Sequence, residues 1–299
     1  MRILNIGSLN IDYVYSVPHF VRPGETIAAS NRDVFAGGKG LNQSIALARA
    51  DAHVSHAGMV GQDGQHLVDL LKAEGVDVSN ITQTADLNTG HAIIQIIPSG
   101  ENAIVIYAGA NGSVTPETIE KALASFNPGE WLLVQNEIAS VDSAIRSAHK
   151  KGMKVAFNPA PMSDEVKNFP LKEVDLLILN RTEATELAEE SEINGLLTKL
   201  KNSLPETDVV LTLGSEGAVF LTGTEIFRHP GFVVNALDTT GAGDTFTGFF
   251  IAELMRSNCP EKALSLAYRA AAICFSRAGA VSSIPSLAEV LTFGQAPDC

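Results

Sequence analysis

Residues 39–74 decide the fold class, because they carry a helix, a strand and a second helix in succession: KGLNQSIALARADAHVSHAGMVGQDGQHLVDLLKAE. Apolar residues recur at helical spacing over Lys39–Ala50, Val54–Val60 is strand-like, and Gln65–Glu74 predicts a further helix. Strand and helix alternating in this way favour a parallel sheet covered by helices on both faces.

The same alternation continues along most of the chain. The sequence predicts strands at Arg2–Gly7, Trp131–Gln135, Lys154–Asn158, Leu176–Asn180 and Val209–Leu213, and helices at Ser140–Lys150, Asp244–Ser257 and Pro260–Ser276. We therefore expect an α/β fold with a central, mostly parallel sheet flanked by helices, in a single domain over residues 1–299.

Two segments interrupt the alternation. Asp12–Phe35 alternates apolar and polar residues around the turn signal Pro23-Gly24, and Thr89–Tyr107 forms two β runs around a turn at Pro98–Asn102. We predict a small antiparallel β lid from segments at about 12–36 and 89–108. The alternative is that these strands extend the main sheet.

Composition excludes several classes of function. The chain has 299 residues, of which 45% are hydrophobic and 18% charged, and its net charge is −13. Such an acidic chain is a poor candidate for binding nucleic acid or an anionic membrane through its bulk charge. An anionic ligand would have to be held by backbone amides or by a bound cation.

The cysteines and the N-terminus predict a location in the cytoplasm. Cys259, Cys274 and Cys299 form no C-x-x-C pair, which argues against a disulfide framework or a zinc cluster. Polar residues interrupt the apolar N-terminal run, so it predicts a first strand and not a signal peptide. We find no apolar run long enough to span a membrane.

The densest chemical signal is DTTGAGDTF at residues 238–246, a loop of small residues that leads into an apolar helix. Backbone amides at such a helix N-terminus form an anion-binding hole. Asp244 lies at its mouth, where a carboxylate can either cap the helix or take part in catalysis. The neighbouring glycines leave room for a ligand that a cap would not require.

A second glycine-rich loop, GGKGLNQ at residues 37–43, also opens a helix. It lacks the spacing of a P-loop, and Gly7-Ser8-Leu9-Asn10 lacks the dinucleotide-binding pattern. Asn42, with Asn10 and Asp12, offers hydrogen-bond partners suited to hydroxyl groups, although such residues near turns are usually local structure formers.

Other residues are open to two interpretations. Asn180 to Glu183 lies at a strand end, where ligands of α/β sheets gather, but taken alone it is more typical of a helix N-cap with an acidic first turn. Thr212 to Gly217 reads as a hairpin whose glycines would let a nucleotide approach, and Glu137 reads as a loop acid. His53, His56 and His91 lack metal-ligand spacing and are interpreted as surface or lid residues.

Taken together and in this order, the motifs resemble the ribokinase-like carbohydrate kinases, the PfkB family. The resemblance runs from Gly7 to Pro285, and most of its specificity lies in Gly37–Gly40 and in Asp238–Asp244, about two hundred residues apart. Within the family the ribokinase subfamily is most similar, on stretches that include Pro23–Thr26, Gly100–Asn102 and Ala108–Asn111.

The resemblance implies ATP-dependent phosphorylation of a sugar hydroxyl, in this subfamily the 5-hydroxyl of D-ribose. Asp244 would be the catalytic base, and the amides of Gly241, Ala242 and Gly243 would stabilise the developing charge. The sugar-binding residues implied are Asn10, Asp12, Gly38, Lys39, Asn42, Glu137 and Asp244.

The resemblance also implies cofactor positions and a partner. Asn180 and Glu183 match a motif associated with magnesium and phosphate, and Gly243 would contact the phosphates. Thr212, Gly214, Ser215 and Gly217 would border the nucleotide, with Tyr268 near the adenine. A monovalent-cation site, usually for potassium, would use Asp238, Thr240, Cys274, Arg277, Gly279 and Ser283, several through backbone carbonyls. A homodimer would form through the β lid.

Two alternatives stay open at this stage. The same chemistry could serve another acceptor, such as fructose, another ketose or acid sugar, or a nucleoside. The scaffold could also be a catalytically silent sugar- or nucleotide-binding protein, although the complete Gly241–Asp244 loop argues against that.

Overall fold

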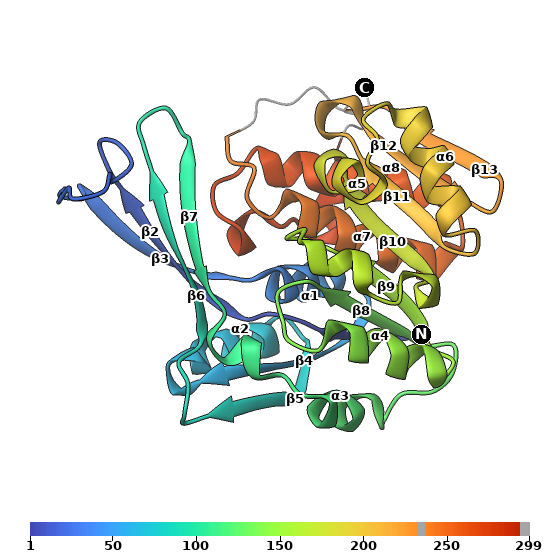
Figure 1. Cartoon of the computed structure of the whole chain (residues 1–299), viewed down its shortest axis with the longest axis horizontal. Helices are drawn as coiled ribbons and strands as arrows, with labels where there is room; N and C mark the ends of the chain where they lie inside the picture. The colour runs from blue at the N-terminus through green and yellow to red at the C-terminus, as the bar shows by residue number, and fades with distance from the viewer. Residues whose placement is uncertain (232–236, 294–299) are drawn as a thin grey trace.

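The computed structural model describes residues 1–231 and 237–293 (Figure 1). The domain expected over 1–299 therefore includes two stretches, 232–236 and 294–299, that lie outside the described residues; Cys299 is in the second of them. Within the described ranges, no helix is long and apolar enough to cross a membrane.

A main sheet runs through the body of the molecule, in the strand order β13-β12-β11-β10-β9-β8-β1-β4-β5. Its strands are β1 (Arg2–Ile6), β4 (His53–Gly61), β5 (Asp77–Thr84), β8 (Trp131–Gln135), β9 (Lys154–Asn158), β10 (Leu176–Asn180), β11 (Asp208–Thr212), β12 (Ala218–Thr222) and β13 (Glu225–His229). Neighbours pair in parallel from β5 to β11, whereas β12 pairs antiparallel with both β11 and β13. The predicted mostly parallel sheet is confirmed.

Helices cover both faces of this sheet (Figure 1). One face carries α1 (Lys39–Arg49), α2 (Gln65–Ala73), α7 (Ala242–Ser257), α8 (Pro260–Phe275) and α9 (Leu287–Thr292), and the other carries α3 (Pro116–Leu123), α4 (Val141–Lys150), α5 (Arg181–Ala188) and α6 (Ile193–Ser203). Successive strand residues feed opposite cores: Leu133 packs with the first set and Leu132 with the second. Strands buried on both faces explain the continuous apolar runs in the sequence.

A second, four-stranded sheet projects from the body in the order β3-β2-β6-β7 (Figure 1). Its strands are β2 (Asn10–Ser16), β3 (Asn31–Gly37), β6 (Gly90–Ile96) and β7 (Asn102–Tyr107). The predicted separate lid is confirmed, and the alternative of an extended main sheet is wrong. The two outer pairings are antiparallel as expected, but the central β2–β6 pairing is parallel, because the chain returns to the lid only after building α1, β4, α2 and β5.

Candidate active site

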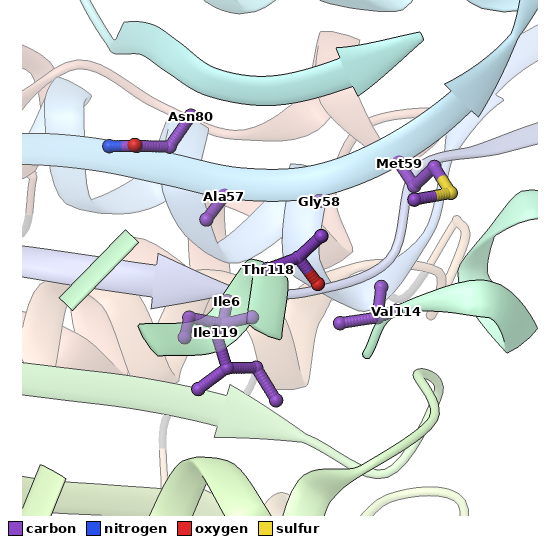
Figure 2. Close-up of a pocket in the computed structure, with 8 residues that line it drawn as sticks. All are labelled: Ile6, Ala57, Gly58, Met59, Asn80, Val114, Thr118 and Ile119. Atoms are coloured by element: carbon purple, nitrogen blue, oxygen red, sulfur yellow. The ribbon is translucent and has the colours of Figure 1, made fainter. Parts of the chain in front are cut away.

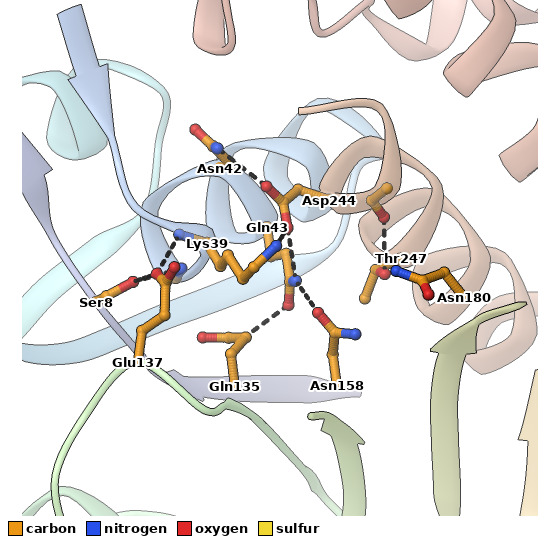
Figure 3. A network of polar contacts seen from close by, with 12 residues as sticks. Ser8, Lys39, Asn42, Gln43, Gln135, Glu137, Asn158, Asn180, Asp244 and Thr247 are labelled. Carbon is orange, nitrogen blue, oxygen red and sulfur yellow. Dashed lines mark hydrogen bonds and ion pairs between the residues drawn. The ribbon is translucent and has the colours of Figure 1, made fainter. Parts of the chain in front are cut away.

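The two glycine-rich loops meet in space, although they are far apart in the sequence. Helix α7 begins after Gly241, whose φ of 77° is left-handed, so Asp244 falls in its first turn. The carboxylate of Asp244 is almost buried and turns towards α1, where Asn42 Nδ2 donates to its Oδ2 at 3.0 Å and Gln43 Nε2 donates to its Oδ1 at 2.9 Å (Figure 3). Because its oxygens accept these bonds from another helix, a cap for α7 does not describe its role.

The space beside this turn is open. A Cβ atom added to Gly243 would meet nothing within 4 Å, so a ligand can approach the backbone at the start of α7. The N-terminus of an α-helix presents unpaired amide groups and a partial positive charge. The backbone N–H of Ala242 donates to the carbonyl of Thr239 at a long 3.4 Å. The anion hole at residues 241–243 stays a prediction.

Lys39 lies between the acidic groups of the site. Its Nζ is 4.0 Å from Asp244 Oδ1. The negative charge of Asp244 raises the pKa of Lys39; burial opposes this, and Glu137 and Glu183 add to it. A lysine that stays charged here supplies a positive centre close to Asp244, within the electrostatic reach of Glu137 and Glu183.

Glu137 is attached to the first glycine-rich loop. Its carboxylate follows β8 and accepts hydrogen bonds from the Ser8 hydroxyl and, at 2.9 Å, from the backbone N–H of Lys39. Ser8 Oγ also accepts from Gly40 N at 3.2 Å. Glu137, which the sequence predicts to be an acid in a loop, therefore lies against the first glycine-rich loop.

Asn10 and Asp12 enter the site from the lid strand β2. Asn10 Oδ1 accepts from Asn111 Nδ2 at 2.8 Å. The Asp12 carboxylate lies directly over Gly37, where an added Cβ would be 2.1 Å from its Oδ2. Burial, together with the charge of Glu137, raises the pKa of Asp12 to about 6. The structure therefore brings the predicted sugar-site residues together in one cluster.

The predicted nucleotide residues gather at the next strand ends. Asn180 and Thr212 are register partners at the ends of β10 and β11. Asn180 and Glu183 form a capping box for α5, which confirms the structural interpretation of this motif. Burial raises the pKa of Glu183, against the hydrogen bond from Asn180 and the charge of Lys39. The role of Asn180 and Glu183 towards magnesium and phosphate stays a prediction.

The turn after β11 packs against α8. The Tyr268 hydroxyl donates to the carbonyl of Gly214, and its ring stacks on His229 with centroids 5.5 Å apart. Gly217 has a φ of 105°, and a Cβ there would be 1.9 Å from the carbonyl of His229. The strand–turn–strand interpretation of Thr212–Gly217 is confirmed, with Ser215 inside the short helical turn Gly214–Glu216.

The predicted cation residues form a cluster behind the anion hole. Asp238 accepts from the backbone N–H groups of Thr240 and Gly279, each at 2.9 Å. Although burial acts in the opposite sense, these bonds lower the pKa of Asp238. Cys274 Sγ lies 2.9 Å from Ser283 Oγ and 3.7 Å from the carbonyl of Thr240.

The side chain of Arg277 does not take part in this cluster, and its backbone N–H donates to the carbonyl of Cys274 at 3.0 Å. Its guanidinium group pairs with Glu289, with Nη2 2.6 Å from Oε1, so the side chain points away to α9. The remaining donors, carboxylate, hydroxyl and carbonyl oxygens, are the type that hard cations prefer.

Sequence reasoning missed several residues of the site. Ser8, Gln43, Asn111, Gln135 and Asn158 are all buried and hydrogen-bonded around it. The signal of Gln43, Gln135 and Asn158 was a polar residue in a largely apolar helix or strand, whereas Ser8 and Asn111 lie in a loop and a short turn and gave no such signal. The interpretation of His56 as a surface or lid residue is wrong: it is fully buried on β4, and burial lowers its pKa to about 4.

A small pocket on the other face of the main sheet is too small to bind a sugar or a nucleotide. It has a volume of about 10 Å³ and is lined by residues that include Ile6, Ala57 and Ile119, which belong to the core on the α3–α4 face (Figure 2). That volume is barely sufficient for one water molecule. Helices α1 and α7, which carry Gln43 and Asp244, lie on the opposite face.

Comparison with known proteins identifies the family to which the chain belongs. A family model described as pfkB family carbohydrate kinase matches residues 2–287. The chain is 36% identical over 300 residues to the ribokinase of Haemophilus influenzae, with 96% of each sequence covered.

Solved structures are similar over the same length. A ribokinase from Cryptococcus neoformans in complex with ADP has a TM-score of 0.83 at 33% identity, covering 97% of this chain and 98% of that one. An Arabidopsis thaliana ribokinase complexed with ribose and ATP has a TM-score of 0.83 at 27% identity, covering 97% of both chains.

Proposed function

The chain belongs to the pfkB family of carbohydrate kinases and is an ATP-dependent sugar kinase; from this premise we propose that it transfers the γ-phosphoryl group of ATP to the 5-hydroxyl group of D-ribose. The observation that carries the proposal is the position of Asp244. Its carboxylate stands at the open N-terminus of α7, held by amides of the helix that lines the sugar pocket.

Asp244 acts as the general base. The 5-hydroxyl oxygen bonds to the γ-phosphorus while the bond from that phosphorus to the β,γ-bridging oxygen breaks, and the hydroxyl proton passes to Asp244. ADP leaves with the bridging oxygen. Because phosphoryl transfer has a loose transition state, the proton leaves late and a weak base suffices. The amides of Gly241, Ala242 and Gly243 stabilise the charge on the transferring group.

The sugar is oriented by side chains from both sides of the pocket. Asn42 Oδ1 is buried, and within residues 1–231 and 237–293 it has no hydrogen-bond partner, so it is available to a sugar hydroxyl. A buried acceptor without a partner is costly, which favours a ligand that donates to it. Asn10, Asp12, Lys39 and Glu137 provide further polar contacts. Gly38 has a φ of 93°, and a Cβ there would be 3.0 Å from the backbone of Asn10 and Ser8, so glycine lets the loop pack against them.

The nucleotide lies along the ends of β10 and β11. Asn180 and Glu183 stand on the phosphate side, where magnesium bound with ATP would neutralise phosphate charge. Thr212, Gly214, Ser215 and Gly217 border the nucleotide, and Tyr268 lies near the adenine.

A monovalent cation such as potassium would be held by Asp238 and Ser283 with backbone carbonyls of the Thr240, Cys274, Arg277 and Gly279 region. The positive charge of this cation would help to stabilise a phosphate group at the proposed anion hole, in a chain whose own net charge is −13. Replacing potassium by sodium should then lower kcat, and equal rates in both salts would remove this site from the proposal.

The lid forms a homodimer contact. One face of the lid exposes apolar side chains to solvent: the register partners Ile93 and Val105 are 41% and 66% exposed, and Val34, which lies beyond Tyr13 in the same row, is 48% exposed. A contiguous exposed apolar patch is typical of an interface. Sedimentation of the protein should show a dimer, and Val105→Lys should shift it towards monomer; a monomeric unaltered protein would contradict the lid contact.

A coupled ADP-release assay tests the reaction and the acceptor together. With Mg-ATP and potassium, D-ribose should give a higher kcat/KM than D-fructose, 2-deoxyribose or nucleosides, because a site that pairs each hydroxyl rejects analogues strongly. Asp244→Asn should retain sugar binding and lose roughly 10²–10⁴-fold in kcat.

The other outcomes select among the alternatives. Turnover with another acceptor keeps the chemistry but discards ribose. Sugar binding without turnover of any acceptor favours a silent binding protein. An active Asp244→Asn enzyme would show that the base has been misassigned.

A further inference from the structure

A chain of buried side-chain amides connects Asp244 through Gln43 to Gln135 and Asn158, at the ends of β8 and β9 (Figure 3). It continues from Gln135 to Asn5 in β1. We propose that Gln43, in α1, is a positioning residue that fixes the orientation of the Asp244 carboxylate for proton transfer. This inference rests on the proposed function, because it assigns Gln43 a role in the same reaction.

The contacts of Gln43 use its whole amide group. Nε2 donates to Asp244 Oδ1 at 2.9 Å and to Asn158 Oδ1 at 3.0 Å. Oε1 accepts from Gln135 Nε2 at 2.7 Å. Both amide hydrogens are thus engaged by protein atoms, and Gln43 is fully buried. It contacts the base and leaves no donor for a sugar.

The direction of this amide is set independently of Asp244. Asn158 Nδ2 donates to the backbone carbonyl of Ile178 at 2.9 Å, which turns its Oδ1 to Gln43. A carbonyl can only accept, so Asn158 cannot reverse without losing this bond. Gln43 must then present Nε2 to Asn158, and therefore to Asp244.

A second backbone carbonyl fixes the other end of the chain. Asn5 Nδ2 donates to the carbonyl of Gly40 at 2.8 Å, so Asn5 Oδ1 faces Gln135 and accepts from its Nε2 at 2.9 Å. Gln135 accordingly presents Nε2 to Gln43 Oε1. Two anchors at opposite ends of the network require the same orientation of Gln43.

The network also gives Gln43 a rigid support. Asn5, Gln135 and Asn158 lie on the adjacent strands β1, β8 and β9, and Gln135 and Asn158 are register partners. Asn42, the other donor to Asp244, keeps a buried oxygen without a partner in the described part of the chain. Asn42 is therefore suited to respond to the sugar, whereas Gln43 is suited to hold the base still.

Gln43→Met keeps the length of the side chain and removes its hydrogen bonds. A misplacement of a catalytic group by about 1 Å costs on the order of 10²-fold. We expect kcat to fall by about this factor. The KM for the sugar should change by less than about threefold, because in the unaltered protein the amide of Gln43 bonds to protein groups and not to the sugar.

Two further variants separate positioning from stability. Thr207→Val removes another buried hydrogen bond, from Thr207 Oγ1 to the carbonyl of Val174 at 2.9 Å, just before β11 begins and so at the end of that strand away from Thr212. It should lower the melting temperature without lowering kcat. If Gln43→Met does not fold, Gln43→Asn can replace it. This variant keeps a polar amide but is one methylene too short to reach Asp244, and its kcat and its KM for the sugar are compared with those of the unaltered enzyme in the same way.

A double-variant cycle with Asp244→Asn gives the deciding result. If Gln43 acts through the Asp244 carboxylate, Gln43→Met in the Asp244→Asn background should cost less than about threefold in kcat, because residues that act as a unit are not additive. A full loss in both backgrounds, or a sugar KM that rises as much as kcat falls, would overturn the proposal.

The acceptor for these measurements is the one that the unaltered enzyme turns over best. A preference for a sugar other than ribose would then overturn the acceptor proposed above and not the role of Gln43. Absence of turnover with every acceptor would overturn both.

Discussion

The glycines at 37–40 and those at 241–243 open two helices that meet at the same site, but the space around them differs. A Cβ atom at Gly37 would be 2.1 Å from the Asp12 carboxylate, and one at Gly40 would be 2.4 Å from the backbone nitrogen of Ser8. A Cβ at Gly243 would meet nothing within 4 Å. Glycine in the first loop permits close packing of the protein, whereas Gly243 leaves room for a ligand.

This contrast explains why similar motifs carry different functions. The first loop is held from several sides, since Glu137 bonds to the backbone of Lys39 and Ser8 bonds to the backbone of Gly40. The second loop presents its backbone to an open space beside Asp244. This difference supports the proposal that the first loop shapes the sugar site and that the second receives the transferring phosphoryl group.

Gly40→Ala should have the largest effect and should appear in stability. The added methyl group would overlap the backbone of Gly7 and Ser8, and neither can move without disturbing β1 and the entry to the lid. Overpacking of this kind costs typically about 1–3 kcal/mol, and backbone overlap lies at the upper end. Chemical denaturation measures the loss, and an unchanged midpoint would show that the first loop is not packed as described.

Gly243→Ala should lower activity without lowering stability, in contrast to Gly40→Ala. Alanine is more favourable than glycine inside a helix by roughly 0.5–1 kcal/mol, and nothing obstructs its methyl group. The methyl group would instead occupy the ligand space, so kcat/KM for ATP should fall by on the order of 10²-fold. A variant as active as the unaltered enzyme would mean that the second loop is not the phosphoryl site.

Asp12→Asn should show a smaller effect that depends on pH. The pKa of Asp12 is raised to about 6 from an ordinary value of 3.8, so the native state binds more protons than the unfolded state between these values. The stabilisation from the protonated form is complete below about pH 4 and is lost as the pH rises through 6. The variant should therefore gain in melting temperature over the unaltered protein at pH 7.5 and show no gain at pH 4.

Sugar binding by the same variant gives the matching control. At pH 7.5 the loss of a charged acceptor should weaken sugar binding roughly tenfold. At pH 5, where Asp12 of the unaltered protein is mostly protonated, the two proteins should bind the sugar more nearly alike. Equal differences at both pH values would contradict the raised pKa of Asp12.

Much of the fold could be predicted because its strands are buried on both faces. Trp131–Gln135 and Leu176–Asn180 have in the structure the bounds expected from their apolar runs. Strands β5 and β13 gave no comparable signal, since β5 reads DVSNITQT at one edge of the sheet and β13 lies at the other. An edge strand packs on fewer neighbours, so its sequence is less constrained to be apolar.

The parallel pairing inside the lid could not be predicted from local patterns. Strands β2 and β6 are separated by about eighty residues and pair in the register Asn10 with Gly90. Turn signals predict hairpins between neighbours in the chain, which here are β2–β3 and β6–β7. The pairing of the two hairpins depends on where β1 and β5 of the main sheet end, because β2 follows β1 and β6 follows β5 along the chain.

The sequence by itself determined which segments are strands and helices of the core, and which loops are rich in glycine, because these depend on the spacing and size of neighbouring residues. Only the tertiary structure decided the direction of Asp244 and the network that holds it. Gln43, Asn158 and Gln135 come from three separate segments, and each amide orientation depends on the next through a hydrogen bond. Such a dependence exists only when the backbone carbonyls that anchor it are already in place.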